Sequence, residues 1–193
     1  MARWLIAALA LGVSAGEPDR DPSKLKAGLF LYAAPAMRDP NFAESVVLLV
    51  EHGAGGSMGL IVNRPTRVPL RELLPGFDDK TSSLRFYAGG PVQPEAILAL
   101  VRTSWPSESA RRVLSDVYLT GALDDVRSAL GAKDPGATLK VFTGYAGWGK
   151  GQLEAEVRAG AWIMDRADAR SVFTPDPTEL WQRVFTILER LVA

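Results

Sequence analysis

Short apolar runs, separated by glycine, proline and polar residues, dominate the chain and predict strands. They occupy residues 29–33, 45–51, 59–63, 96–102, 117–120, 139–143 and 161–164. Continuous apolar runs of this length are typical of strands that are covered on both faces of a sheet. Glycines at positions 53, 55, 56 and 59 separate two of the runs, so we expect a hairpin with a longer loop there.

Apolar residues recur at helical spacing in fewer places. Leu123, Val126 and Leu130 predict a helix that stops at Gly131. A helical turn is expected at 70–74, a helix at 151–158 and a final amphipathic helix at 178–192. Because strands and helices do not alternate, the pattern favours an α+β domain with a mixed sheet over a doubly wound parallel sheet.

The first 24 residues differ in character from the rest. Residues 1–15 combine Arg3, an uncharged apolar stretch and small residues, which is the pattern of a secretory signal peptide. The stretch is shorter than the ~20 apolar residues that span a bilayer, and no other segment is a transmembrane candidate. Residues 16–24 resemble a polar linker, and residues 25–193 are expected to form one domain. We therefore expect export to the periplasm; a misassigned start codon and a cytoplasmic protein are the alternative.

The composition removes several classes of function. The chain has no cysteine and one histidine, His52, which excludes a disulfide framework, a thiolate site and most zinc sites. Lys and Arg total 22 and Asp and Glu total 22, so the basic excess typical of DNA-binding proteins is missing. We expect no cofactor and no nucleic acid, with a small anionic ligand or a protein partner as the open alternatives.

Two glycine-rich motifs suggest chemistry. Gly55 to Gly59 matches G-x-S-x-G around Ser57, but it leads into a strand, whereas the nucleophile of an α/β-hydrolase lies on a strand-to-helix turn. His52 would be its base. Gly144 to Gly151 nearly matches the phosphate-binding loop G-x-x-x-x-G-K-[ST], with Lys150 in place but a glycine where the hydroxyl is required. Ordinary turns are the favoured interpretation of both motifs.

The acidic residues form no convincing acid–base couple. Glu51 and His52 are neighbours on a predicted strand, so their side chains should point to opposite faces. Glu154 and Glu156 are two positions apart on a predicted helix and should also point in different directions.

The order of several short motifs resembles that of the YqgE/AlgH family. The motifs are Asp39-Pro40-Asn41-Phe42, Ser45-Val46-Val47, Glu51-His52, Met58-Gly59-Leu60-Ile61-Val62-Asn63-Arg64-Pro65, Gly89-Gly90-Pro91, Gly144-Tyr145-Ala146-Gly147-Trp148 and Gly151-Gln152-Leu153-Glu154. The resemblance implies an α+β fold around a large mixed, mostly antiparallel sheet with flanking helices. It implies no reaction, because the family has no established biochemical activity. Relatives usually have a small apolar residue where this chain has Ser57, so no family role is carried over to that serine.

Together these features predict a non-catalytic binding or regulatory protein. The candidate ligand-binding residues are Glu51, His52, Asn63, Arg64, Gly89, Gly90, Tyr145, Trp148 and Lys150. Glycine-rich turns let backbone N–H groups approach a ligand, and a guanidinium such as that of Arg64 suits an anion. The alternatives are an anion- or nucleotide-binding protein, a hydrolase-like enzyme that uses the glycine-rich loops, and a transcriptional regulator.

Overall fold

The computed structural model describes residues 20–73, 84–183 and 185–186. The strands are β1 (Leu29–Ala33), β2 (Val46–Gly53), β3 (Gly56–Ile61), β4 (Pro65–Pro69), β5 (Arg85–Ala88), β6 (Val92–Arg102), β7 (Arg111–Arg112), β8 (Val117–Thr120), β9 (Leu139–Trp148) and β10 (Trp162–Arg166). The helices are α2 (Leu70–Leu73), α3 (Leu123–Leu130), α4 (Gln152–Arg158) and α5 (Ala169–Val172), and 3-10 turns lie at Pro22–Lys24, Pro135–Ala137 and Pro177–Glu179.

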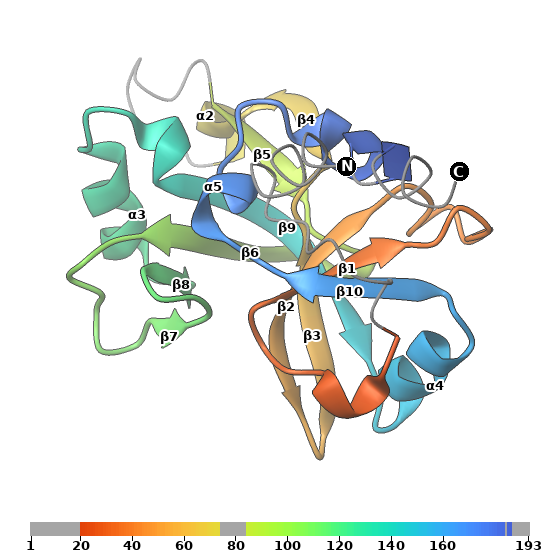
Figure 1. The fold of residues 1–193 in the computed structure, drawn as a ribbon. Coiled ribbons are helices and arrows are strands. Elements are labelled where there is room, and N and C mark those ends of the chain that lie inside the picture. The colour runs from red at the N-terminus through yellow and green to blue at the C-terminus, as the bar shows by residue number, and fades with distance from the viewer. Residues whose placement is uncertain (1–19, 74–83, 184, 187–193) are drawn as a thin grey trace, which may run out of the picture.

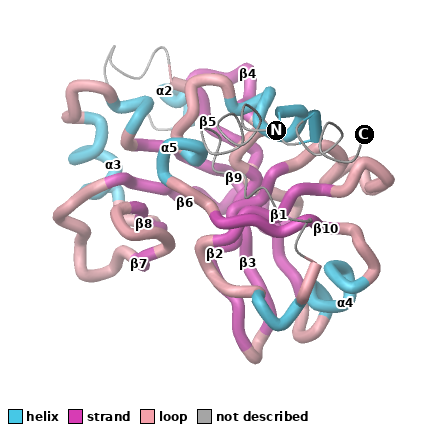
Figure 2. Tube along the Cα trace, viewed as in Figure 1, coloured by secondary structure: helices cyan, strands magenta, loops and turns pink. Residues whose placement is uncertain are grey.

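In the described residues the ten strands form one curled sheet with short helices around it (Figure 1). The strand order is β10-β1-β2-β3-β9-β6-β8-β7, with β4 and β5 joined to it through β9. The β5–β9 pair is parallel, and the other pairs are antiparallel. Strands fill the centre of the molecule and helices lie at its periphery (Figure 2). The predicted single α+β domain is confirmed in this coarse form, with more sheet than helix.

The central strands bury side chains on both faces, as their continuous apolar runs predicted. In β1, Phe30 and Tyr32 belong to one apolar cluster, whereas Leu29, Leu31 and Ala33 belong to the cluster on the other face. Successive strand residues point to opposite faces, so a strand between two covered faces needs apolar residues at every position.

Helices α3 and α4 cover different parts of the sheet. Leu153 and Val157 of α4 are fully buried in the second cluster, and Val126 and Leu130 of α3 pack on a third cluster near β6 and β8. The spacing of these residues is the helical spacing seen in the sequence. In the described part of the chain no helix has both the length and the apolar character needed to cross a membrane.

Two predictions about the glycine-rich segments are wrong. β2 and β3 are joined by a tight turn at Ala54 and Gly55 rather than by a longer loop. β9 continues to Trp148, so the residues from Gly144 onward that resemble a phosphate loop lie in a strand. Tyr145 pairs with Val92 of β6, and residues 146–148 pair with β3. An extended backbone paired with neighbouring strands does not curl its N–H groups around one anion. Only residues 149–151 form the turn before α4.

Strands β4, β5 and β7 were not predicted from the sequence. Strand β6 begins at Val92, four residues earlier than predicted. These segments are short, or carry proline and charged residues, so they lack the apolar run that identified the other strands. Their pairing is decided by neighbours that are distant in the sequence. The strands predicted at 29–33, 45–51, 117–120 and 161–164 and the helices at 70–74, 123–130 and 151–158 are confirmed within one or two residues. The strand predicted at 59–63 begins three residues earlier, at Gly56, and the strand predicted at 139–143 extends five residues further, to Trp148.

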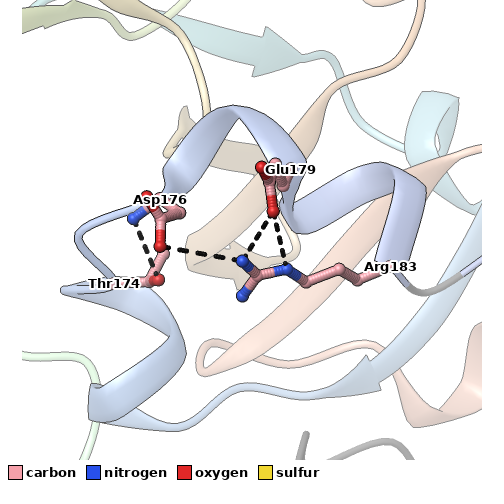
Figure 3. A network of polar contacts seen from close by, with 4 residues as sticks. All are labelled: Thr174, Asp176, Glu179 and Arg183. Atoms are coloured by element: carbon pink, nitrogen blue, oxygen red, sulfur yellow. Dashed lines mark hydrogen bonds and ion pairs between the residues drawn. The ribbon is translucent and has the colours of Figure 1, made fainter.

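A polar network of exposed side chains lies at the start of the C-terminal helix. The Arg183 guanidinium donates to Glu179 Oε2, with Nη2 at 2.7 Å, and lies 3.7 Å from Asp176 Oδ2 (Figure 3). Trp181 donates its indole N–H to the Ala33 carbonyl at 2.7 Å, which ties this segment to β1. The rest of the helix predicted at 178–192, and the predicted signal peptide at 1–15, lie outside the described residues.

Candidate functional site

Asn63 holds the loop that precedes β2. Its Oδ1 accepts a hydrogen bond from the Val46 N–H at 2.8 Å, and its Nδ2 donates to the Glu44 carbonyl at 2.9 Å. Glu44 has a φ of 56°, a conformation that non-glycine residues adopt at a cost. The buried amide of Asn63 therefore helps to stabilise a strained backbone position.

Arg64 contacts the same loop from the next position. Its guanidinium donates to the carbonyls of Asn41 at 2.5 Å and Ala43 at 2.7 Å. Burial lowers the pKa of the Arg64 guanidinium, and the nearby carboxylates of Asp39 and Glu44 oppose that effect. The N–H groups of Arg64, which were predicted to bind an anion, donate instead to backbone carbonyls of this chain.

Gly89 and Gly90 lie against the backbone of β9. The Gly89 N–H donates to the Thr143 carbonyl at 2.9 Å, and a Cβ on Gly89 would lie 2.4 Å from the Gly144 carbonyl oxygen. A Cβ on Gly90 would lie 2.2 Å from the carbonyl carbon of Tyr145. These glycines allow a close approach of two protein segments to each other.

Lys140 is a buried cation that the sequence analysis did not single out. It lies in β9 with 3% of its surface exposed, donates from Nζ to the Val62 carbonyl at 3.2 Å and sits 4.2 Å from the centre of the Tyr87 ring. Burial lowers the pKa of Lys140 to about 7 and raises the pKa of Tyr87 to about 12. Both shifts reflect the cost of placing a charge away from water.

Trp148 is part of an aromatic cluster under α4. Its indole N–H and that of Trp162 both donate to Glu156 Oε2, at 2.9 and 2.8 Å. The Phe42 ring stacks on Trp148 with ring centres 6.1 Å apart. One carboxylate therefore satisfies two indoles that lie in the core.

Glu51 and His52 contact different elements, in agreement with the expectation that they point apart. Glu51 Oε2 accepts from Arg111 Nη1 of β7 at 2.5 Å. His52 Nδ1 lies 2.8 Å from Ser57 Oγ on β3, and His52 Nε2 lies 4.0 Å from Glu154 Oε1 of α4. We call His52, Ser57 and Glu154 the hairpin cluster.

The structure divides the nine predicted residues between the two ends of β3. Glu51, His52, Trp148 and Lys150 are near the β2–β3 turn and α4, and Asn63, Arg64, Gly89, Gly90 and Tyr145 are near the other end. Ser57 and Asn63 are six residues apart, which corresponds to about 20 Å along a strand. They therefore do not form one site, and their ligand-binding role stays a prediction.

A pocket lies at a third place, between the end of β6 and α3. It has a volume of about 160 Å³ and is lined by residues that include Arg102, Trp105, Asp125 and Ser128. The Trp105 side chain beside it is 90% exposed. We call this place the Trp105 pocket.

The charged groups of the Trp105 pocket are held by neighbours within the chain. Asp125 Oδ2 accepts hydrogen bonds from Ser107 Oγ at 2.7 Å and Thr120 Oγ1 at 2.6 Å. Arg102 Nε donates to Asp116 Oδ2 at 2.6 Å. Two charged side chains of the pocket wall, Arg102 and Asp125, are therefore positioned by contacts within the chain.

Sequence reasoning missed the Trp105 pocket and the approach of Glu154 to His52. The sequence did contain a signal for the Trp105 pocket. Trp105 lies in the polar stretch Thr103-Ser104-Trp105-Pro106-Ser107, where no strand or helix that could bury it is expected. The second contact joins residues about 100 positions apart, and no local pattern reveals it.

The fold and these sites define a single-domain sheet protein that has a preformed pocket and, in the described ranges, no group of three His, Asp or Glu side chains placed to hold a metal ion. Residues 30–191 match the model of the AlgH-like family, DUF179. The chain belongs to this family, which confirms the resemblance found in its motifs.

Relatives and solved structures agree with the assignment. The chain is 39% identical over 161 residues to a UPF0301 protein of Myxococcus xanthus, covering 81% of this chain and 87% of the relative, and 37% identical over 164 residues to one of Chromobacterium violaceum, covering 82% and 88%. The solution structure of AlgH from Pseudomonas aeruginosa is similar with a TM-score of 0.65 and 31% identity, covering 86% and 88%. The crystal structure of DIP2367 from Corynebacterium diphtheriae, at 22% identity and a TM-score of 0.71 with 88% of each chain covered, supports the fold alone. These names state a family and no activity.

Proposed function

We propose that the protein acts by binding a protein partner at the Trp105 pocket. The observation that carries this proposal is the 90% exposure of the Trp105 side chain beside a preformed cavity. A tryptophan that becomes buried removes roughly 150–250 Å² from water, and tryptophan is enriched among the residues that dominate the energy of protein interfaces. An exposed indole beside a cavity offers a partner both apolar area to cover and a recess to fill.

The size of the cavity favours a protein partner over a free small molecule. At about 160 Å³ it is smaller than the ~300–1,000 Å³ of pockets that enclose drug-sized ligands. It suits one polar side chain of a partner, with Trp105 inserted into the partner's own surface. Because Asp125 and Arg102 are already held in place, little side-chain freedom is lost on binding.

Site-specific photo-crosslinking tests the proposal. A photoreactive amino acid replaces Trp105 in one protein and Val68 in the control, since Val68 is also an exposed apolar residue, at 38%, but lies in β4. We expect a product of discrete mass from position 105 in cells of the source organism and none from position 68. The partner, once purified, should bind Trp105→Ala at least ~10-fold more weakly than wild type, which corresponds to about 1.4 kcal/mol.

Two results contradict the proposal. One is the absence of any product at position 105, and the other is the same set of products at positions 105 and 68. If the purified partner binds Trp105→Ala with unchanged affinity, the pocket is not part of the interface.

A further inference from the structure

A hydroxyl, an imidazole and a carboxylate meet in the hairpin cluster, which is separate from the Trp105 pocket. In Figure 1 the β2–β3 turn and α4 lie at the bottom of the molecule, and α3 with β7 and β8 lies at the left. His52 connects the two oxygen-bearing groups, with Ser57 Oγ 2.8 Å from Nδ1 and Glu154 Oε1 4.0 Å from Nε2. Binding at Trp105 makes no use of this arrangement.

The backbone keeps Ser57 and His52 facing each other. The two residues are direct partners in the β2–β3 ladder, and Ser57 is paired on its other side with Trp148 of β9. Side chains of directly opposed residues project from the same face of a sheet, with Cβ atoms about 4.5–5.5 Å apart. A strand held on both sides fixes the hydroxyl relative to the ring without help from a ligand.

Glu154 lies 4.0 Å from Nε2, on the side of the imidazole away from Ser57, which is the place from which a carboxylate influences the His52 tautomer. A carboxylate beside Nε2 favours the tautomer with its hydrogen on that nitrogen, and this leaves the lone pair of Nδ1 directed at the Ser57 hydroxyl. The order of groups is then nucleophile, base and carboxylate, which is the arrangement that activates serine in acyl transfer. The carboxylate comes from the first turn of α4, a helix whose Leu153 is fully buried.

The three side chains of the hairpin cluster differ in exposure. Ser57 is 9% exposed, and the side chains of His52 and Glu154 are 17% and 28% exposed. Gly53 and Gly55 border the turn, and a Cβ at either position would meet nothing within 4 Å. The tip of the hairpin therefore projects into solvent, while His52 and Glu154 are the more exposed members of the cluster.

We propose that Ser57 is a nucleophile that takes an acyl group from small carboxylic esters or thioesters, with His52 as its base and Glu154 as a positioning residue. Ser57 Oγ bonds to the carbonyl carbon while its proton passes to His52 Nδ1. The bond from that carbon to the leaving oxygen or sulfur then breaks, and the leaving group departs with the proton from His52. Water releases the acyl group from Ser57 by the same route, and a carboxylic acid is formed.

The expected rate enhancement is enough for reactive esters but not for unreactive ones. General-base assistance by one imidazole contributes typically ~10²–10⁴-fold, which is sufficient for esters with good leaving groups. The first observable event is therefore a single acyl group on Ser57, formed from an activated ester such as p-nitrophenyl acetate.

Acylation by p-nitrophenyl acetate, followed by mass mapping of the modified residue, tests the proposal on the full chain. We expect one acetyl group on Ser57 in wild type and none at that position in Ser57→Ala. The rate of acylation should fall about 100-fold or more in His52→Gln. It should fall less in Glu154→Gln, and Glu154→Asp should recover part of that loss because a carboxylate is restored.

Ser115→Ala is the matched control, because Ser115 is an exposed serine that lies 3.4 Å from a carboxylate oxygen of Asp116. Its acylation pattern should equal that of wild type, and thermal unfolding verifies that each variant is folded. Acetyl groups on Lys150 or other amines with Ser57 unmodified would overturn the proposal. Equal acylation rates in wild type and His52→Gln would overturn it as well, because the hydrogen bond between His52 and Ser57 would then only stabilise the hairpin.

Discussion

The β3–α4 side of the molecule and the β6–α3 side use their polar and aromatic residues differently. The first side extends along β3, from Asn63 and Arg64 at one end to α4 at the other. There Asn63 and Arg64 donate hydrogen bonds to loop carbonyls, and Glu156 accepts hydrogen bonds from two buried indoles. On the second side, Trp105 is left in solvent beside a pocket. The residues that carry the family resemblance thus largely maintain the fold, whereas the surface we assign to binding lies in a segment with no such motif.

Removing the carboxylate of Glu156 should cause the largest loss of stability. Glu156→Ala leaves the indole N–H groups of Trp148 and Trp162 without their acceptor. A buried donor without a partner costs about 1–3 kcal/mol, so we expect a loss of roughly 2–5 kcal/mol in denaturant unfolding. Glu156→Gln retains an acceptor oxygen and should lose less. Equal stability of the two variants would show that the aromatic cluster does not depend on this contact.

Replacing Lys140 should instead stabilise the protein. Its pKa falls from 10.5 in the unfolded chain to about 7 in the folded protein, so between these values the unfolded chain binds more protons and wild-type stability rises with pH. Lys140→Met removes a buried charge, and we expect a gain of about 1–4 kcal/mol near pH 7. The difference between the two proteins should shrink as pH rises from about 7 to 10. A less stable variant, or parallel pH profiles, would contradict this account.

Truncating Arg64 should have a smaller effect. Arg64→Ala removes two hydrogen bonds to the Asn41 and Ala43 carbonyls, and hydrogen bonds that involve a charged group contribute about 1.5–3 kcal/mol. Because Arg64 is only half-buried, we expect a loss of about 1–2 kcal/mol in the free energy of unfolding. Arg67→Ala, an exposed arginine in β4, should stay within ~0.5 kcal/mol of wild type. A ligand-binding Arg64 without a structural role would leave stability unchanged.

The predictable parts of the fold are those decided by local pattern. The runs that became β1, β2 and β8 and the spacing that became α3 were visible because apolar periodicity reports burial directly. The extension of β9 through Gly144 and Gly147 was not visible, because glycines signal a turn locally. Gly144 is instead required for close packing, since a Cβ there would lie 2.5 Å from the Gly90 carbonyl oxygen.

The candidate site was predictable only in part, for a related reason. His52 and Ser57 are five positions apart, and their contact follows once the hairpin is tight rather than long. Glu154 joins them through tertiary packing alone. The exposure of Trp105 is likewise decided by which segments leave it uncovered, and composition does not report that.

Denaturant unfolding of Trp105→Ala beside Arg64→Ala tests the contrast between the two sides most directly. Trp105 is 90% exposed, so its truncation should change the free energy of unfolding by no more than ~0.5 kcal/mol, while Arg64→Ala loses about 1–2 kcal/mol. That result would show that the Trp105 indole contributes little to stability and is available to a partner, whereas the Arg64 guanidinium stabilises the fold. A loss of 2 kcal/mol or more in Trp105→Ala, on the scale of about 3–5 kcal/mol for removing a core aromatic, would mean that Trp105 supports the fold and would contradict its assignment to binding.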